Sequence, residues 1–403
     1  MMNRQKCVID IRKPAKVLVL ALTFLLLFGI KLYAQEKIPI LAWYSIPAED
    51  ATLARYQELK DAGFTITFSH TSNFRDAKKA LDLSAAVGIK SIFTCDELET
   101  DPEATVRKIK KHPGLAGYFL CDEPVCSDFP DLTKWAKRIM TIDNTHYCYL
   151  NLNPNYAPES VLGDTYEGYV RRFIEEVNIQ IVSFDFYPVV NDQLRDRWYD
   201  NLEVVAKESK KANKPFWAFA LSTAHDDYPV PDAAQLKLQM YSNLAYGAQC
   251  LQYFTYWNPD TTTWNFHQAP ITLDKKRSPV YDIVREVNKE LQNRAFVFMG
   301  ANVLSVHHTG TIPIGTQKLE TLPVQVASLD TKEDGAVVSL LEKGNYQYLV
   351  IVNQSFLKPL DVTIKFNSKV ELVRKDGSIE DTAKYGSWYQ LEAGGAKIFR
   401  WEK

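Results

Sequence analysis

Two adjacent acids, Asp122 and Glu123, follow an apolar run and precede a proline, Pro124. A carboxyl group held there among aromatic neighbours is partly desolvated, and its pKa rises towards neutrality. Such a group could act as a general acid that protonates a leaving oxygen, so Glu123 is the first catalytic candidate in the chain. The alternative is that Asp-Glu-Pro opens a loop and that its acids cap the next helix.

A second acid is required if the reaction also needs a base or a nucleophile. Asp185, within Ser-Phe-Asp-Phe-Tyr-Pro at 183–188, ends another apolar run among aromatic side chains and is the first choice. The alternative for Asp185 is a hydrogen bond to the protein or to a substrate hydroxyl, because a buried Asp usually has a partner. Weaker candidates follow other apolar runs: Asp96, Glu97, Asp226 and Asp227.

Aromatic rings and polar side chains also stand at the ends of apolar runs. A flat ring can stack on a sugar while neighbouring amides, acids and imidazoles bind its hydroxyls, so these residues predict a sugar-binding surface. Packing in the core or at its rim is the alternative for each aromatic ring and each histidine. The substrate-binding candidates are Trp43, His70, Asp122, Asn151, Asn153, Tyr187, His225, Trp257 and Asn258.

The elements that must position these candidates are eight short β-branched or aromatic runs, each followed by a helical stretch. Their spacing of roughly 25 to 36 residues is typical of parallel strands joined by crossovers. The sequence therefore predicts an α/β fold, a (β/α)8 TIM barrel over 36–295, with its chemistry where strands end. An open doubly wound sheet is the rival, but no glycine-rich phosphate turn follows the first run. The expected strands begin near Ile40, Phe64, Ile89, Leu115, His146, Ile179, Pro215 and Gln249.

After Phe296 the helical periodicity disappears, and alternating or wholly apolar runs take over. Lys-Gly-Asn at 343–345 and Lys-Asp-Gly at 375–377 are typical of turns between strands. We therefore predict a small C-terminal antiparallel β-sandwich over 300–403. Its expected strands include 336–341, 346–353, 362–366 and 396–401.

The first residues of the chain resemble an export signal. Basic side chains within residues 1–16 precede an apolar run over 17–30, and Ala34 offers a cleavage point. The run is shorter than the roughly 20 residues that span a bilayer. We expect a signal peptide over 1–34 and an exported protein, periplasmic or secreted, that leaves the membrane after cleavage. The alternative is an uncleaved N-terminal anchor.

Charge and missing motifs exclude several functions. The 47 basic and 49 acidic side chains nearly cancel, so bulk charge predicts no binding to nucleic acid. Sequences typical of serine esterases, zinc proteases, EF-hands and nucleotide-binding loops are not found. No spacing suited to structural zinc occurs, and no cofactor is expected. The oligomeric state is left open.

The run Gly117–Pro124 resembles the fourth strand of the large clan of TIM-barrel retaining glycosidases, whose Asn-Glu-Pro carries the acid/base Glu. Asp122 stands where that motif has Asn. The chain is more closely similar to glycosidase-like proteins of Bacteroidota polysaccharide-utilisation systems, over nearly all of the mature chain. The resemblance implies that Glu123 is the acid/base and that Trp257 is a platform beneath the sugar. Further segments that carry it are Tyr149–Tyr156, Pro215–Phe219 and Tyr246–Trp257.

The chain departs from this clan at its seventh strand, where the clan has a nucleophilic Glu and residues 217–225 have none. Two-carboxylate hydrolysis places the acids about 5–5.5 Å apart for retention or about 6.5–9.5 Å apart for inversion. We expect an exported glycoside hydrolase that acts on an oligosaccharide or polysaccharide, with Glu123 as general acid/base and Asp185 as base or nucleophile. One alternative is a catalytically silent glycan-binding barrel. Another is a lyase with His225 or Tyr187 as base, which needs a basic uronate-binding cluster that the sequence does not reveal.

Overall fold

The computed structural model describes residues 36–382 and 387–403, and Lys37–Lys403 form one compact unit. The expected signal peptide over 1–34 lies outside the described residues. Among the residues that are described, no helix combines the length and the apolar character needed to cross a membrane.

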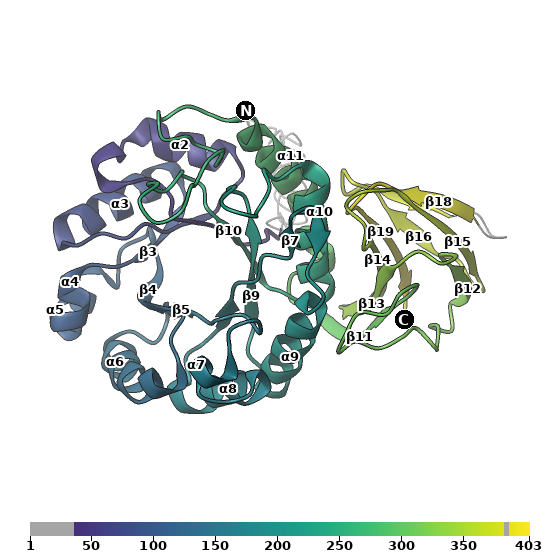
Figure 1. Cartoon of the computed structure of the whole chain (residues 1–403), viewed down its shortest axis with the longest axis horizontal. Coiled ribbons are helices and arrows are strands. Elements are labelled where there is room, and N and C mark those ends of the chain that lie inside the picture. The colour runs from purple at the N-terminus through teal and green to yellow at the C-terminus, as the bar shows by residue number, and fades with distance from the viewer. Residues whose placement is uncertain (1–35, 383–386) are drawn as a thin grey trace, which may run out of the picture. The chain divides into compact units, whose positions relative to one another are not determined.

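Eight parallel strands in the described residues form a barrel, which confirms the predicted TIM-barrel fold (Figure 1). A bridge between Leu152 and Phe184 joins the two end strands of the sheet and closes it. Each strand begins within three residues of its predicted start. In order around the sheet the strands are β5 (Tyr147–Asn151), β4 (Leu115–Asp122), β3 (Lys90–Phe93), β2 (Ile66–Thr67), β1 (Ile40–Trp43), β10 (Cys250–Phe254), β9 (Phe216–Leu221) and β6 (Val182–Phe184).

Alternation along the strands sorts side chains between the barrel interior and the surrounding helices. On β1, Leu41 and Trp43 belong to the cluster inside the barrel, whereas Ile40 and Ala42 belong to the cluster beneath the helices. This follows from the two-residue period of a strand. Because side chains fill the interior, the open ends of the strands are where a substrate can bind.

The helices around the barrel begin and end at ordinary signals. Asn73 caps α3 by accepting a hydrogen bond from the Asp76 amide, and Gly88 ends it with φ +78°. Asp232 and Gln235 form a capping box at α10. The helices are α2 (Leu53–Asp61), α3 (Phe74–Val87), α4 (Asp96–Thr100), α5 (Pro102–Ile109), α6 (Phe129–Ile142), α7 (Glu159–Leu162), α8 (Tyr166–Arg172), α9 (Trp198–Lys211), α10 (Ala233–Ala245), α11 (Pro279–Asn293) and α12 (Ala295–Phe298), with shorter helical turns at Ala48–Asp50, Cys126–Asp128 and Phe173–Val177.

The C-terminal part, as described for 302–382 and 387–403, is the predicted antiparallel β-sandwich. Gly344 makes the turn between two long strands with φ +56°, where the sequence predicts a turn. The larger sheet has the order β11 (Asn302–His308), β13 (Ala336–Lys343), β14 (Tyr346–Asn353), β19 (Ala396–Glu402), β16 (Glu371–Val373) and β17 (Ile379–Asp381), and the smaller sheet has the order β12 (Val326–Asp330), β15 (Leu360–Phe366) and β18 (Ser387–Leu391).

The central strands of the larger sheet, β13 and β14, are largely buried on both faces. Along β14, Leu349 and Ile351 pack against the smaller sheet, whereas Val350 and Val352 join the cluster that continues into the barrel helices. This explains why residues 348–352 within this strand are apolar without interruption rather than alternating. Helices α10 and α12 contact the barrel side of this sheet.

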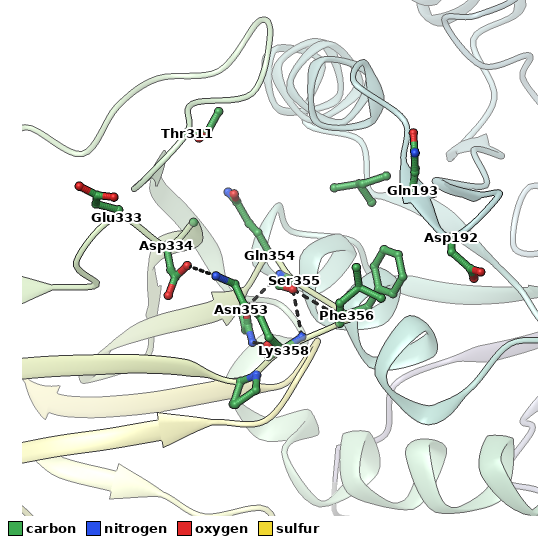
Figure 2. Close-up of a pocket in the computed structure, with 14 residues that line it drawn as sticks. Asp192, Gln193, Thr311, Glu333, Asp334, Asn353, Gln354, Ser355, Phe356 and Lys358 are labelled. Atoms are coloured by element: carbon green, nitrogen blue, oxygen red, sulfur yellow. Dashed lines mark hydrogen bonds and ion pairs between the residues drawn. The ribbon is translucent and has the colours of Figure 1, made fainter.

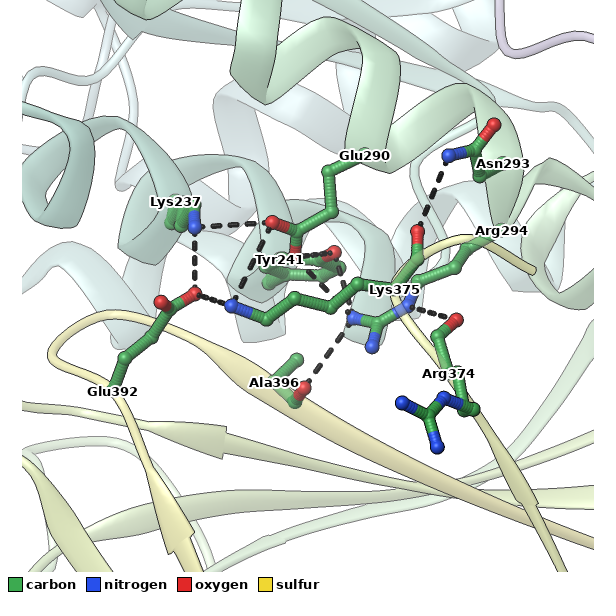
Figure 3. Close-up of polar contacts among 9 residues, drawn as sticks. All are labelled: Lys237, Tyr241, Glu290, Asn293, Arg294, Arg374, Lys375, Glu392 and Ala396. Atoms are coloured by element: carbon green, nitrogen blue, oxygen red, sulfur yellow. Dashed lines mark hydrogen bonds and ion pairs between the residues drawn. The ribbon is translucent and has the colours of Figure 1, made fainter. Parts of the chain in front are cut away.

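Charged side chains surround this contact between barrel and sandwich (Figure 3). The Lys237 ammonium lies 3.0 Å from a Glu290 carboxylate oxygen and 2.6 Å from Glu392. Arg294 is 2 % exposed and donates to the Tyr241 hydroxyl at 2.8 Å and to the Arg374 carbonyl at 3.1 Å. These bonds satisfy a buried cation and fix the two parts against each other.

Candidate active site

Three acids converge at the carboxyl ends of β4 and β6. Asp122 is the last residue of β4, Glu123 follows it with φ +47°, and Asp185 directly follows β6. Asp122 is in register with Asn151 on β5, and the closing bridge places the end of β6 beside the residue after Asn151. The barrel therefore brings together the two carboxylates that the sequence predicts, with Asp122 beside them.

The three acids differ in exposure, yet the pKa of each is raised. Asp122 and Glu123 are exposed, whereas Asp185 is 7 % exposed. Burial and the charge of Glu123 raise the pKa of Asp122 to about 7, and burial raises that of Glu123. Burial, followed by the charges of Glu123 and Asp122, raises the pKa of Asp185 well above its usual value. Although Asp122 and Glu123 are exposed as residues, desolvation of their carboxyl groups is the largest cause of each raised pKa.

A chain of buried hydrogen bonds holds Asp185 from inside the barrel. The Asn151 side-chain amide donates to Asp185 Oδ1 at 3.0 Å, and Ser183 Oγ donates to Asn151 Oδ1 at 3.0 Å. Gln252 Nε2 donates to Ser183 Oγ at 2.8 Å, and the Tyr149 hydroxyl donates to Gln252 Oε1 at 2.7 Å. Because Ser183 donates to Asn151 Oδ1, the amide N–H groups of Asn151 face Asp185, so Asn151 orients a predicted catalytic group.

The burial of Asp185 bears on its role. A base or nucleophile must be ionised, whereas burial and two neighbouring acids favour the neutral form of Asp185. The neutral form donates a hydrogen bond, which fits the alternative of binding a substrate hydroxyl. Neither Glu123 nor Asp185 forms an ion pair with a basic side chain in the described part of the chain, so no cation fixes either in its ionised form.

Main-chain hydrogen bonds fix the loop that carries Glu123. The Glu123 amide donates to the Asn151 carbonyl at 2.8 Å. Asn153 Nδ2 donates to the carbonyls of Glu123 at 2.8 Å and Pro124 at 3.2 Å, and the Tyr169 hydroxyl donates to Pro124 O at 2.6 Å. Asn153 is thus a positioning residue for Glu123. Because its amide nitrogen is used in this way, only its Oδ1 is left for the predicted contact with substrate.

Trp43 and His70 lie next to each other. Trp43 is 4 % exposed and packs inside the barrel, with its ring centroid 4.5 Å from that of Phe68 and 5.6 Å from that of Phe119. The exposed His70 ring stands edge-on to the same two rings, and burial lowers its pKa. Trp43 therefore forms the floor beneath the strand ends, and His70 is the member of the pair that water reaches.

Tyr187 and His225 share two aromatic neighbours, Tyr228 and Phe254. The Tyr187 ring is 5.4 Å from that of Phe254, and the His225 ring is 4.6 Å from that of Tyr228. His225 Nδ1 lies 3.2 Å from the Thr223 carbonyl, and burial lowers the pKa of His225. Sequence reasoning missed Phe254, the last residue of β10, although its place at a strand end was the signal that could have found it.

Trp257 is not brought to this group. It is 4 % exposed, belongs to the cluster beneath the helices, and has the Arg55 guanidinium of α2 5.2 Å from its ring. Asn258 is also buried, and its amide donates to the carbonyls of Pro259 and Phe266. The expected platform role of Trp257 therefore lacks the required placement, because the residue lies three positions beyond the end of β10, where strand alternation no longer applies.

Strand β9 ends without an acid, as the sequence indicates. Ser222 and Thr223 follow it and are fully buried. Ser222 Oγ donates to the Thr255 carbonyl at 2.7 Å, and the hydroxyls of Thr223 and Thr255 are 2.7 Å apart. Hydroxyl groups bonded to Thr255, the residue after β10, thus stand where the resemblance to TIM-barrel glycosidases implies a carboxylate. The weaker acidic candidates are on other segments: Asp96 and Glu97 begin α4, and Asp226 and Asp227 lie between β9 and α10.

A separate hollow of about 420 Å³ lies beside the barrel (Figure 2). On one side is the hairpin of β7 (Val189–Val190) and β8 (Gln193–Leu194), and on the other is the sandwich loop after β14. Its lining holds none of the three convergent acids, so the catalytic candidates lie elsewhere. No group of three metal-ligating side chains is found among residues 36–382 and 387–403.

Comparison with known proteins supports this architecture. Residues 163–294 match the family model described as Glyco_hydro_42, beta-galactosidase, and no curated protein matches the chain in sequence. A family 42 β-galactosidase from G. stearothermophilus is similar in structure, with TM-score 0.59 and 10 % identity over 91 % of this chain and 98 % of that one. A family 39 glycoside hydrolase from Bacteroides cellulosilyticus has TM-score 0.54 and 9 % identity over 91 % and 81 %.

A β-galactosidase from Marinomonas ef1 aligns with TM-score 0.48 and 10 % identity over 64 % of this chain, which spans only 60 % of that enzyme. At such identities the structures establish the fold alone, and the family model adds a sequence match over the second half of the barrel. The expected resemblance to TIM-barrel glycosidases is thereby confirmed. The chain is a TIM barrel with a C-terminal β-sandwich, similar in fold to TIM-barrel glycosidases and matching a family 42 glycoside hydrolase model over residues 163–294.

Proposed function

We propose that the protein hydrolyses glycosidic bonds of an oligosaccharide or polysaccharide at the carboxyl end of its barrel. The observation that carries this proposal is the convergence of Asp122, Glu123 and Asp185, all with raised pKa, at the strand ends where TIM-barrel enzymes place their chemistry. The match to a glycoside hydrolase family model supports it.

In the proposed reaction Glu123 is the general acid/base. It gives its proton to the leaving glycosidic oxygen as the bond from that oxygen to the anomeric carbon breaks. Water supplies the hydroxyl group that the anomeric carbon gains, and the proton that this water loses passes to an ionised carboxylate. That carboxylate is Glu123 in the second step of a retaining reaction, or the second acid in an inverting one. Asp185 is the second carboxylate if the bound sugar favours its ionised form, and otherwise it holds a substrate hydroxyl while Asp122 provides the negative charge. Retention and inversion are both compatible with these roles.

A catalytically silent glycan-binding protein is the second candidate. Two observations favour it: β9 ends in buried hydroxyl groups in place of an acid, and Asp185 is held in a setting that favours its neutral form. The two candidates differ only in whether a bond is broken.

Replacing Glu123 with Gln separates the two candidates. Wild type should release reducing ends from at least one member of a panel of plant, host and microbial glycans. Glu123→Gln should lower kcat by about 10²- to 10⁴-fold while the glycan still binds, because the amide cannot donate a proton to the leaving oxygen. Glu320→Gln, which alters an exposed acid of the sandwich, is the matched control. If wild type and Glu123→Gln bind alike and both leave every glycan intact, the glycan-binding alternative is correct.

Export is a further part of this proposal and rests on the sequence of residues 1–34. The intact mass of the protein recovered from the periplasm or the medium should correspond to a chain that starts just after Ala34. Recovery of the full chain from the membrane fraction would favour the uncleaved anchor.

A further inference from the structure

A fixed loop presents Arg195 at the same end of the barrel. The loop follows β6 and contains the β7–β8 hairpin. The Asn191 amide donates to the Asp227 carbonyl at 2.9 Å, which ties the hairpin to the loop after β9. The Arg195 amide donates to the Pro188 carbonyl at 2.8 Å. These two hydrogen bonds fix the main chain of the loop that carries Arg195.

Two tyrosines hold the Arg195 guanidinium. It lies 4.4 Å from the ring centroid of Tyr156, which follows β5, and 5.5 Å from that of Tyr228, which follows β9. Arg195 Nη2 also donates to the Tyr228 hydroxyl at 3.0 Å. Arginine stacks readily on aromatic rings, and such contacts fix the plane of the guanidinium. Tyr156 keeps 44 % of its surface exposed, so this group remains open to a ligand.

No acid neutralises Arg195 in the described part of the chain. Its guanidinium has five N–H donors, and the bond to Tyr228 uses one of them. Burial is the largest cause of the raised pKa of both Tyr156 and Tyr228; a charge on Asp185 raises both pKa values further, whereas that of Arg195 lowers both. Arg195 and Asp185 therefore act on the same pair of rings, yet no salt bridge joins the two within the described residues.

We propose that Arg195, Tyr156 and Tyr228 form a subsite for an anionic group on the glycan, either the carboxylate of a uronic acid or a sulfate ester. The planar guanidinium suits two parallel hydrogen bonds to such oxygens. The exposed Tyr156 ring provides a face for the sugar that carries them. This inference names the substrate class of the proposed hydrolase. Cleavage of the bound glycan rests on the proposed function, whereas binding of the glycan does not.

The test compares the affinities of matched oligosaccharides by calorimetry. Neutral galactose oligomers, galacturonic acid oligomers and sulfated galactose oligomers of equal length distinguish the two anionic sources from each other and from a neutral ligand. At low salt, wild type should bind at least one anionic series about tenfold more tightly than the neutral series. Raising the salt concentration should reduce this preference.

Variants of Arg195 locate the effect. Arg195→Met should lower affinity for the preferred anionic series about tenfold and leave neutral binding within twofold. Arg195→Lys should lose less, because it keeps the charge without the planar fork. The matched control is Arg197→Met. Arg197 lies two residues further along the chain, and its exposed guanidinium pairs with Asp200 at 3.0 Å, so this variant removes the same charge outside the proposed subsite. Thermal unfolding of each variant shows whether it is folded.

The outcomes separate this inference from the proposed function. Equal affinity of wild type for all series, or a folded Arg195→Met that keeps the anionic preference, would overturn the subsite even if neutral glycans are hydrolysed. Binding that depends on Arg195, without release of reducing ends, would uphold the subsite and overturn the hydrolase. Glu123→Gln should bind anionic oligomers as wild type does, since it leaves the Arg195 group intact.

Discussion

At the scale of single residues, burial raises the pKa of Asp122 and Asp185, and the charge of Glu123 raises both further. Each additional negative charge in this group is opposed by those already present, so the acids titrate together rather than independently. Protons held by such a group near neutral pH are available to a leaving oxygen, whichever of the acids delivers them.

Removing the charge of Glu123 should therefore lower the pKa of Asp122 below its value of about 7. Carboxyl-carbon NMR titrations of wild type and Glu123→Gln measure this directly, and Glu320→Gln should leave it unchanged. The folded pKa of Asp122 lies above its usual value, so its contribution to stability is complete below about pH 4 and is lost as the pH rises towards 7. Glu123→Gln should lose less stability across that window, and a larger loss in the variant would contradict the coupling.

Sequence reasoning at this scale could place a residue where it sits at a strand end, while the catalytic role of each such residue stays a prediction. Asp122, Glu123 and Asp185 were expected to converge because the ends of parallel strands share one rim. Trp257 was misplaced because strand β10 ends at Phe254, so its alternation could not be extended to residue 257. Arg195 and its two tyrosines lie on separate loops, and loop residues carry no periodic signal from which their meeting could be inferred.

At the scale of elements, the β4 loop depends on side chains from the segment after β5. Asn153 and Tyr169 satisfy the carbonyls of Glu123 and Pro124. This arrangement fixes the main chain at a residue with positive φ, a conformation that a Glu adopts only when its surroundings hold it there.

Asn153→Asp should disturb this loop more than Tyr169→Phe does. The aspartate would place acceptor oxygens against two carbonyls, at a cost of about 1–3 kcal/mol in free energy of unfolding. Tyr169→Phe removes a hydroxyl that donates to Pro124 O and accepts from the Asn153 main-chain amide at 3.3 Å, but it adds no repulsive group and keeps the ring that stacks on Phe129. Urea unfolding measures stability, and the pH dependence of kcat should change for Asn153→Asp because Glu123 is displaced. A pH profile identical to that of wild type would show that Asn153 serves stability alone.

The barrel strands were predictable as elements because each combines a short apolar run with a following helical stretch at regular spacing. The short helices α4 and α7 and the β7–β8 hairpin were not predicted. They have few residues, and their positions depend on contacts with distant loops, such as that between Asn191 and Asp227. The larger sheet of the sandwich was foreseen as strands, but the burial of β13 and β14 on both faces follows from their contact with the barrel helices.

At the scale of the whole molecule, barrel and sandwich share one hydrophobic cluster, which contains Val350 of β14 and Leu236 of α10. Separating the two parts would expose apolar surface on both. It would also remove the hydrogen-bond partners that the sandwich supplies to the buried Arg294 guanidinium. Residues 37–403 should therefore unfold as one cooperative unit in spite of containing two architectures.

Arg294→Met tests this coupling. It leaves the carbonyl oxygens of Arg374 and Ala396 and the hydroxyl of Tyr241 without their donor, and should lower the free energy of unfolding by about 3–5 kcal/mol. Wild type should show one transition in urea, coincident by circular dichroism and tryptophan fluorescence. The variant should show that transition at lower urea. Two separate transitions in wild type would mean that the parts unfold independently.

The buried hydroxyl groups at the end of β9 restrict which substitutions this strand end can accept. To gain a carboxylate at this strand end, the protein would need an acid in place of Ser222 or Thr223. Both side chains are buried and hydrogen-bonded to Thr255. One mutation would insert a larger charged group and break a tight cross-strand contact at the same time. Substitutions in the loops after β5, β6 and β9 should therefore alter the activity at a smaller cost in stability than an acid introduced at the end of β9.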